Sequence, residues 1–204
     1  MTPESRIMLR PLGNPLPLGF IALAGGTLLV SGLQLKWLEP TEGTQVALVL
    51  IAFVFPLQLV ASVLGFLARD VVAGTGMGIL SGTWLSIALV TLTGQPGATS
   101  DALGLFLLLA AVAMLVPAAT AAAGKLVATA VLATTSLRFA TTGLYQLTAS
   151  DGWKATAGAV GLLLCALALY AALAMALEDA LGRAVLPLGR RAAIDGEPGI
   201  RDQL

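Results

Sequence analysis

Residues 44–67 read TQVALVLIAFVFPLQLVASVLGFL, an uninterrupted apolar run without one charged side chain. About 20 such residues, at 1.5 Å of rise per residue, cross the ~30 Å hydrocarbon core of a bilayer. The run is therefore long enough to be a membrane-spanning helix. Pro56 lies in its middle and lacks a backbone N–H, so we expect a kink at this point.

Five further stretches have the same length and character, and only short polar turns separate them. They are residues 17–35, 71–92, 102–123, 126–147 and 156–177. The first is too long for the apolar region of a cleavable signal peptide, and a short turn joins it to the next span. The sequence thus predicts an all-α polytopic integral membrane protein with six transmembrane helices. Its membrane domain covers residues 14–189, between an N-terminal segment (1–13) and a polar tail (190–204) that we expect to be disordered.

Composition supports this interpretation and excludes several other classes. The chain is 57% apolar and only 11% charged, against about 25% charged residues in an average soluble domain. Eleven basic and eleven acidic residues cancel, so no excess positive charge favours nucleic acid. The chain has no histidine and a single cysteine, Cys165, which excludes His- or Cys-built metal sites and nucleophiles. We expect no enzymatic activity, no cofactor and no metal.

The distribution of Lys and Arg predicts the orientation in the cell membrane. Six spans place both termini on one side, and that side collects Arg6, Arg10, Arg69, Lys125, Arg183, Arg190, Arg191 and Arg201. Lys36 and Lys154 lie on the other side. Because positive residues favour the cytoplasm, both termini are expected to be cytoplasmic. The aromatic residues expected to anchor helices at the opposite interface are Trp37, Tyr145 and Trp153.

Arg138 is the most informative single residue, because it lies deep inside the span 126–147. A charge at such depth costs about 2.5–3.5 kcal/mol, and intramembrane arginines usually face a cavity or a partner. No acidic residue lies within any predicted span to neutralise it, and the neighbouring hydroxyls are Thr134, Thr135, Thr141 and Thr142. The guanidinium therefore suits a carboxylate or another small anion. Two alternatives are that the side chain extends to the outer interface, or that it binds carbonyls freed by Pro56.

Other polar and small residues within the spans suggest where a passage could run. Gln58 is an amide that needs partners at membrane depth, either on another helix or in a pore. Four glycines, Gly74, Gly76, Gly78 and Gly82, cluster in one span. Such a cluster suggests close helix packing, or a face against another subunit or a passage.

Two motifs at opposite ends of the chain resemble a known family. Residues 14–20 read NPLPLGF and residues 181–189 read LGRAVLPLG. They are similar to the Asn-Pro-x-Pro-Leu-Gly signature and the closing Gly-Arg-x-Val-Leu-Pro-x-Gly segment of the acetate uptake transporter family, the YaaH-type succinate–acetate permeases. Gln58 and Trp84 also stand at the family's spacing. In physical terms, Asn14, Pro15 and Pro17 suit a helix start, and the resemblance implies that they and Gly19 lie at the mouth of the passage.

The resemblance further implies a homo-hexamer with one pore for small carboxylates in each subunit. The positions corresponding to the family's constriction are Leu23, Leu80 and Thr135, none of which matches the family's own residue. The candidate substrate-binding residues are Arg138, Thr134, Gln58 and Ser81. Proton symport needs a group that titrates within the membrane, and the predicted spans contain no Asp, Glu or His. We therefore expect an uncoupled pore rather than proton-coupled uptake.

Three functions from different classes remain open at this point. The first is a transporter or channel for small carboxylates such as acetate or succinate, in which Arg138 attracts the anion. The second is a channel for small neutral solutes such as urea or amides. Threonine hydroxyls and Gln58 would supply its hydrogen bonds, and the charge of Arg138 would not be needed. The third is a membrane scaffold or sensor that has lost its passage.

Overall fold

The computed structural model describes residues 13–189. Residues 1–12 and 190–204, with Arg6, Arg10, Arg190, Arg191 and Arg201, lie outside the described residues. They hold nearly all of the predicted N-terminal segment (1–13) and the whole predicted tail. Within residues 13–189 every regular element is a helix, which confirms the all-α fold. In chain order the elements are α1 (Leu16–Gln34), η1 (Pro40–Glu42), α2 (Gly43–Val49), η2 (Leu50–Val54), α3 (Phe55–Leu67), α4 (Val71–Thr93), α5 (Asp101–Ala121), α6 (Leu126–Thr148) and α7 (Asp151–Leu181).

The second predicted span is one long helix with an irregular centre. A π-helical turn, η2, joins α2 to α3 immediately before Pro56. Proline cannot donate the intrahelical hydrogen bond and its ring clashes with the carbonyl four residues earlier. A wider turn at this point relieves the clash, as π-bulges commonly do. The predicted kink at Pro56 is therefore present as a π-turn.

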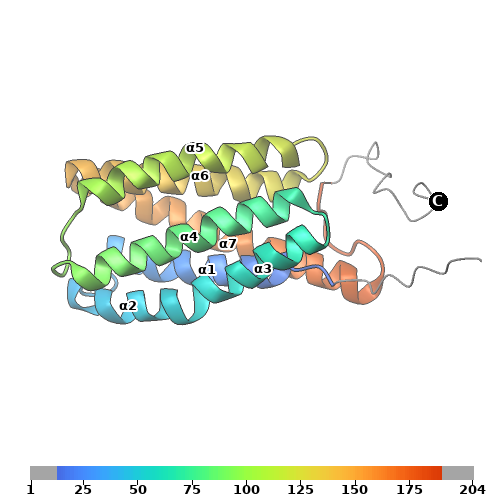
Figure 1. Ribbon diagram of the computed structural model, residues 1–204, viewed down its shortest axis with the longest axis horizontal. Coiled ribbons are helices and arrows are strands. Elements are labelled where there is room, and N and C mark those ends of the chain that lie inside the picture. The colour runs from blue at the N-terminus through green and yellow to red at the C-terminus, as the bar shows by residue number, and fades with distance from the viewer. Residues whose placement is uncertain (1–12, 190–204) are drawn as a thin grey trace, which may run out of the picture.

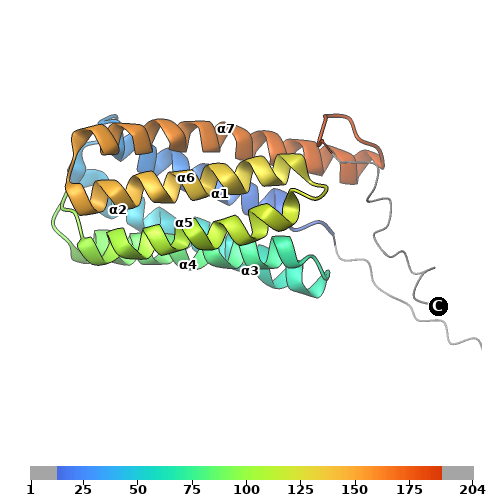
Figure 2. The same cartoon turned by 90° about the horizontal axis from the view of Figure 1, so that it is seen from above.

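The long helices form a bundle along one axis, as Figures 1 and 2 show from two sides. The most extensive helix contacts are between α5 and α6, between α1 and α7, and between α3 and α4. Among the described residues, five helical stretches are long and apolar enough to cross a membrane: α1, Pro40–Leu67, α4, α5 and α7. The remaining long helix, α6, has comparable length but carries Arg138 and several hydroxyls. It lies beside α5 and α7 in the bundle, where it completes the six predicted spans.

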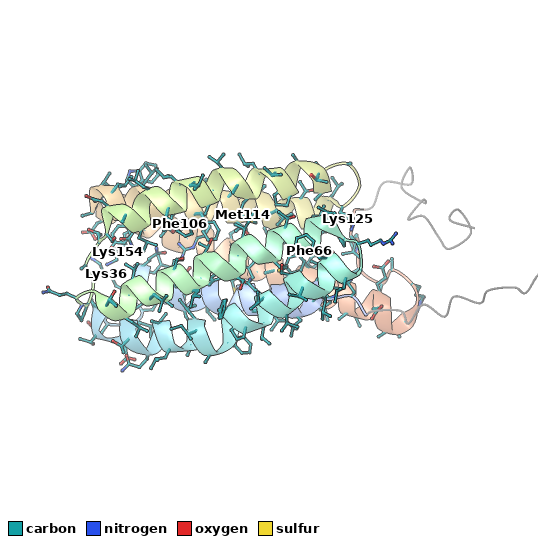
Figure 3. The ribbon with its side chains drawn as sticks, in the orientation of Figure 1. Lys36, Phe66, Phe106, Met114, Lys125 and Lys154 are labelled. Atoms are coloured by element: carbon teal, nitrogen blue, oxygen red, sulfur yellow. The ribbon has the colours of Figure 1, made fainter. Side chains whose placement is uncertain are left out.

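The three lysines of the described chain separate between the two ends of the bundle as the sequence predicts. Figure 3 places Lys125 at one end and both Lys36 and Lys154 at the other. We call these the Lys125 end and the Lys154 end. The first and last described residues both lie at the Lys125 end (Figure 1), as an even number of spans requires.

The glycine cluster is explained mainly by close packing within the chain. A Cβ added at Gly74 would lie 2.6 Å from Phe66, one at Gly76 3.2 Å from Leu132, and one at Gly78 3.0 Å from Ser62. A Cβ at Gly82 would meet nothing within 4 Å. Three of the four glycines thus make room on α4 for side chains of α3 and α6, and only Gly82 has open space in front of it.

Candidate functional site

A cavity of about 200 Å³ lies at the Lys154 end of the bundle. Its outer wall includes the α4–α5 loop, residues 94–100, together with Pro40 and Lys154, and its inner wall includes Leu50 and Leu107. Arg138 and Lys154 are the charged residues in the described wall, and no Asp or Glu lines it. The cavity is therefore a site with positive charge and no internal counter-charge, which favours anions.

An aromatic pair forms the inner floor of this cavity. The rings of Trp84 and Phe139 meet edge to face, with centroids 6.5 Å apart and planes at 71°, and both line the cavity. Gly26 makes room for the indole, because a Cβ there would lie 3.2 Å from the ring. The Trp84 indole Nε1 has no hydrogen-bond partner among the described residues. The sequence analysis singled out Trp84 by spacing but missed Phe139.

The predicted constriction lies just beneath that floor. Leu23, Leu80 and Thr135 are each fully buried, and none of them lines the cavity. Leu80 in α4 and Thr135 in α6 precede the floor residues Trp84 and Phe139 by about one helical turn, and Leu23 in α1 precedes Gly26, which faces the indole, by a similar interval. Since these three helices all run from the Lys125 end to the Lys154 end (Figure 1), the three side chains occupy the next layer inward.

Arg138 is buried, with only 2% of its surface exposed. Its Nη1 donates hydrogen bonds to Oε1 of Gln34 and to the carbonyl of Ala157. The two ion pairs among the described residues are Lys36–Asp151 and Lys125–Asp70, so no described carboxylate neutralises Arg138.

The surroundings of the guanidinium differ from those expected from the sequence. The hydroxyls of Thr141 and Thr142 donate to the main-chain carbonyl of Arg138, at 3.1 and 2.8 Å. A helical threonine readily reaches a carbonyl one turn back, so its hydroxyl is used locally. The side-chain partner is Gln34, which the sequence analysis missed, because a single amide at a helix end carries no distinguishing pattern.

The positions of these partners show that the guanidinium extends toward the Lys154 end. Gln34 is the last residue of α1, and Ala157 lies in the second turn of α7. Neither alternative describes this arrangement, because the guanidinium leans outward but stays buried and the carbonyl that it binds is a different one. The carbonyl belongs to Ala157 and not to the Pro56 region, and the head group remains inside the protein.

A notch on α7 provides the space for this arrangement. A Cβ added at Gly161 would lie 2.1 Å from Oγ of Ser31 and 2.8 Å from Nε of Arg138. Ser31 is fully buried and its Oγ has no hydrogen-bond partner among the described residues. Gly161 is therefore the residue that admits both polar groups.

Tyr145 has a different role from the membrane anchor that the sequence predicts. It is 9% exposed and lines the cavity, and Lys154 Nζ lies 5.6 Å from the centre of its ring. Trp37 and Trp153 are exposed at the same end, as expected for anchors. Tyr145 turns inward because two helical turns separate it from Arg138, which places both on one face of α6.

The other candidate binding residues lie away from the cavity. Gln58 is fully buried; its Nε2 donates to the Gly19 carbonyl at 3.4 Å, while Oε1 has no partner among the described residues. Ser81 donates to the Phe55 carbonyl at 3.1 Å, and Thr134 is half-buried. The structure thus places only Arg138 of this predicted set on the cavity wall.

The entrance motif starts α1 at the Lys125 end. Asn14 Oδ1 accepts a hydrogen bond from the Leu16 backbone N–H at 3.0 Å, and Pro15 and Pro17 flank the first helical residue. This confirms the helix-start interpretation. A Cβ at Gly19 would lie 2.5 Å from Met77 Sδ, so this glycine lets α1 and α4 approach closely.

Comparisons with known proteins agree with this architecture. A family model described as the GPR1/FUN34/yaaH family matches residues 1–187. Among solved structures, one titled as the bacterial acetate channel SatP is similar to the chain, with a TM-score of 0.78 and 25% sequence identity. The similarity covers 88% of this chain and all of that one. A search of curated proteins found no match.

Proposed function

Since the chain belongs to the GPR1/FUN34/yaaH family, we propose that it is a membrane channel or transporter for small carboxylates such as acetate or succinate. The observation that carries this proposal is the cavity whose described wall holds Arg138 and Lys154 and no acidic residue. The similarity to the acetate channel SatP supports the same conclusion.

The chemistry of the cavity suits a small carboxylate in two ways. Buried positive charge without a carboxylate of its own raises the local anion concentration. The largely apolar inner wall, including Leu50, Leu107 and Phe139, suits the short hydrocarbon part of such a molecule. A monocarboxylate of two or three carbons has both parts.

The proposed route crosses the bundle along α1, α4 and α6. A solute enters the cavity, passes the Trp84–Phe139 floor and then the layer of Leu23, Leu80 and Thr135. It continues past Gln58, Ser81 and Thr134, which supply polar contacts, toward Asn14 and Gly19 at the Lys125 end. Because the floor and the layer beneath it are closely packed, side-chain movement accompanies passage.

We propose that each subunit of a homo-hexamer contains its own route, with the Lys125 end at the cytoplasmic face of the cell membrane. Eight of the ten Lys and Arg residues outside Arg138 fall on that side, as the positive-inside rule predicts. The route is uncoupled, because a guanidinium stays protonated and the described spans supply no Asp, Glu or His within the route.

Purified protein in vesicles tests the function. We expect saturable uptake of labelled acetate well above that of protein-free vesicles, and no accumulation above equilibrium when a pH gradient is imposed. Uptake equal to that of empty vesicles would refute the carboxylate pore. Uphill accumulation beyond the leakage of acetic acid would refute the uncoupled mechanism.

A neutral-solute channel is the second candidate, and three polar atoms favour it. Ser31 Oγ, Gln58 Oε1 and Trp84 Nε1 are buried without hydrogen-bond partners among the described residues, and uncharged amides could bind them. Urea uptake that is rapid and indifferent to replacement of Arg138 would support this candidate over the first.

A further inference from the structure

The hydrogen bonds of Arg138 leave one edge of its guanidinium available. A guanidinium carries five N–H donors, and both protons of Nη1 are used by Gln34 and Ala157. Nε and Nη2 make no hydrogen bond among the described residues. These two nitrogens form the side edge of the fork, where two parallel N–H groups meet the two oxygens of a carboxylate.

We propose that Gln34 is the residue that makes this site selective for carboxylates, because it fixes the orientation of Arg138. The proposal rests on the proposed function and extends it to the choice among anions. Gln34 is 94% buried and lines the same cavity as Arg138. By holding Nη1, it aligns the Nε–Nη2 edge for a planar ligand with two oxygens, and a spherical anion such as chloride gains less from this alignment.

The neutrality of the holding groups is essential to the proposal. An amide oxygen and a backbone carbonyl orient the guanidinium while leaving its full positive charge for a ligand. A carboxylate in the place of Gln34 would orient it equally well but neutralise it. The chain has the neutral residue, glutamine, at position 34, and an anion-binding site requires such a neutral partner.

Gly161 fixes the position of the guanidinium from the side of α7. A Cβ there would lie 2.8 Å from Arg138 Nε and 2.1 Å from Ser31 Oγ, so the guanidinium and the Ser31 hydroxyl already fill the space that a side chain would take. Ser31 and Gly161 do not line the cavity. Gly161 therefore supports the placement of Arg138, and the ligand binds on the cavity side of the guanidinium.

Replacement of Gln34 by glutamate tests the neutrality argument. Gln34→Glu is nearly isosteric and adds a negative charge beside Nη1, so we expect acetate uptake in vesicles to fall by about tenfold or more, as expected when a charge-assisted contact is lost. The matched control is Gln45→Glu, an exposed position near the start of α2, which should retain wild-type uptake. Thermal unfolding of both variants in detergent reports whether they fold.

Replacement of Gln34 by methionine tests the orientation argument independently of charge. Gln34→Met preserves volume but removes the acceptor, so Arg138 keeps its charge and loses its alignment. In acetate uptake measured against increasing chloride, we expect the half-inhibitory chloride concentration to fall by about tenfold relative to the wild type, while total anion binding persists.

The outcomes separate this inference from the proposed function. An unchanged chloride sensitivity in Gln34→Met, or full acetate uptake in Gln34→Glu, would overturn the role of Gln34 while the carboxylate pore stands. Absence of acetate uptake in the wild type would overturn the pore itself. If Gln34→Glu fails to fold, the chloride competition of Gln34→Met decides the inference alone.

Discussion

The two ends of the bundle differ in how charged side chains are partnered. At the Lys125 end, Lys125 Nζ pairs with Asp70 Oδ2 at 2.7 Å, and glycines bring α3 and α4 into contact. At the Lys154 end, Arg138 is held by neutral oxygens and opens onto a cavity with no acidic residue in its described wall. The ion pair of Lys125 with Asp70 joins two helix ends and leaves no net charge for a ligand. The positive charge of Arg138 is not neutralised and can therefore attract an anion from outside the chain.

Removal of the charge at Arg138 is the strongest way to break this contrast. Arg138→Leu takes away the cavity's deepest cation, so we expect acetate uptake in vesicles to fall to the level of empty vesicles. It also leaves the Gln34 amide and the Ala157 carbonyl without their donor, which costs about 1–3 kcal/mol of stability. Arg183→Leu, at an exposed position beyond the end of α7, is the control and should keep full uptake. Normal uptake in Arg138→Leu would remove Arg138 from the route.

Filling the notch at Gly161 tests the position of the guanidinium without changing any charge. In Gly161→Ala the new methyl group would lie 2.1 Å from Ser31 Oγ and 2.8 Å from Arg138 Nε, so both must move. We expect acetate uptake to fall by roughly tenfold and stability by about 1–3 kcal/mol. Gly82→Ala, where nothing lies within 4 Å, adds the same methyl group and should change neither quantity. If Gly161→Ala and Gly82→Ala had the same acetate uptake and the same stability, the role of Gly161 in placing Arg138 would be contradicted.

Lys154, the outer cation of the cavity, is expected to have a smaller effect on acetate uptake than Arg138, because it acts over a longer distance. Lys154 lines the cavity above the Tyr145 ring, so Lys154→Gln should reduce acetate uptake by about two- to fivefold at low salt. The reduction should shrink at 0.15 M salt, where the Debye length is about 8 Å. Lys36 lies at the same end but is exposed and outside this cavity, so Lys36→Gln should have little effect. An equal loss of acetate uptake in both variants would show that the effect comes from the general positive charge of this end and not from a lysine in the cavity wall.

The Lys125 end provides the smallest expected effect. Asp70→Asn removes the ion pair with Lys125 but keeps the side-chain oxygen that accepts from the Ala73 backbone N–H at 3.0 Å. Both partners are partly exposed, 37% and 25%, so the loss is about 0–1 kcal/mol in thermal or denaturant unfolding. Acetate uptake should stay within about twofold of the wild type, since a partly exposed pair contributes little. A large loss of uptake would show that this end also selects the solute.

Local patterns account for what the sequence predicted correctly. The apolar stretches, the helix start at Asn14–Pro17 and the irregularity at Pro56 all depend on residues close together in the chain. The role of Tyr145 was predicted incorrectly, because an aromatic residue near a span end has the same local pattern whether it faces lipid or a cavity. Phe139 and Gln34 were missed for the same reason, since their neighbours come from other helices.

The sequence by itself determined which six stretches form the long helical segments of the bundle, because a bilayer's thickness and apolarity act on each stretch separately. It also determined that Arg138 has no acidic partner within the predicted spans. Only the tertiary structure decided which groups hold that charge, because Gln34 and Arg138 stand 104 positions apart. Their meeting depends on α1 and α6 both packing against α7 and on the space that Gly161 leaves between them, and no local pattern encodes this packing.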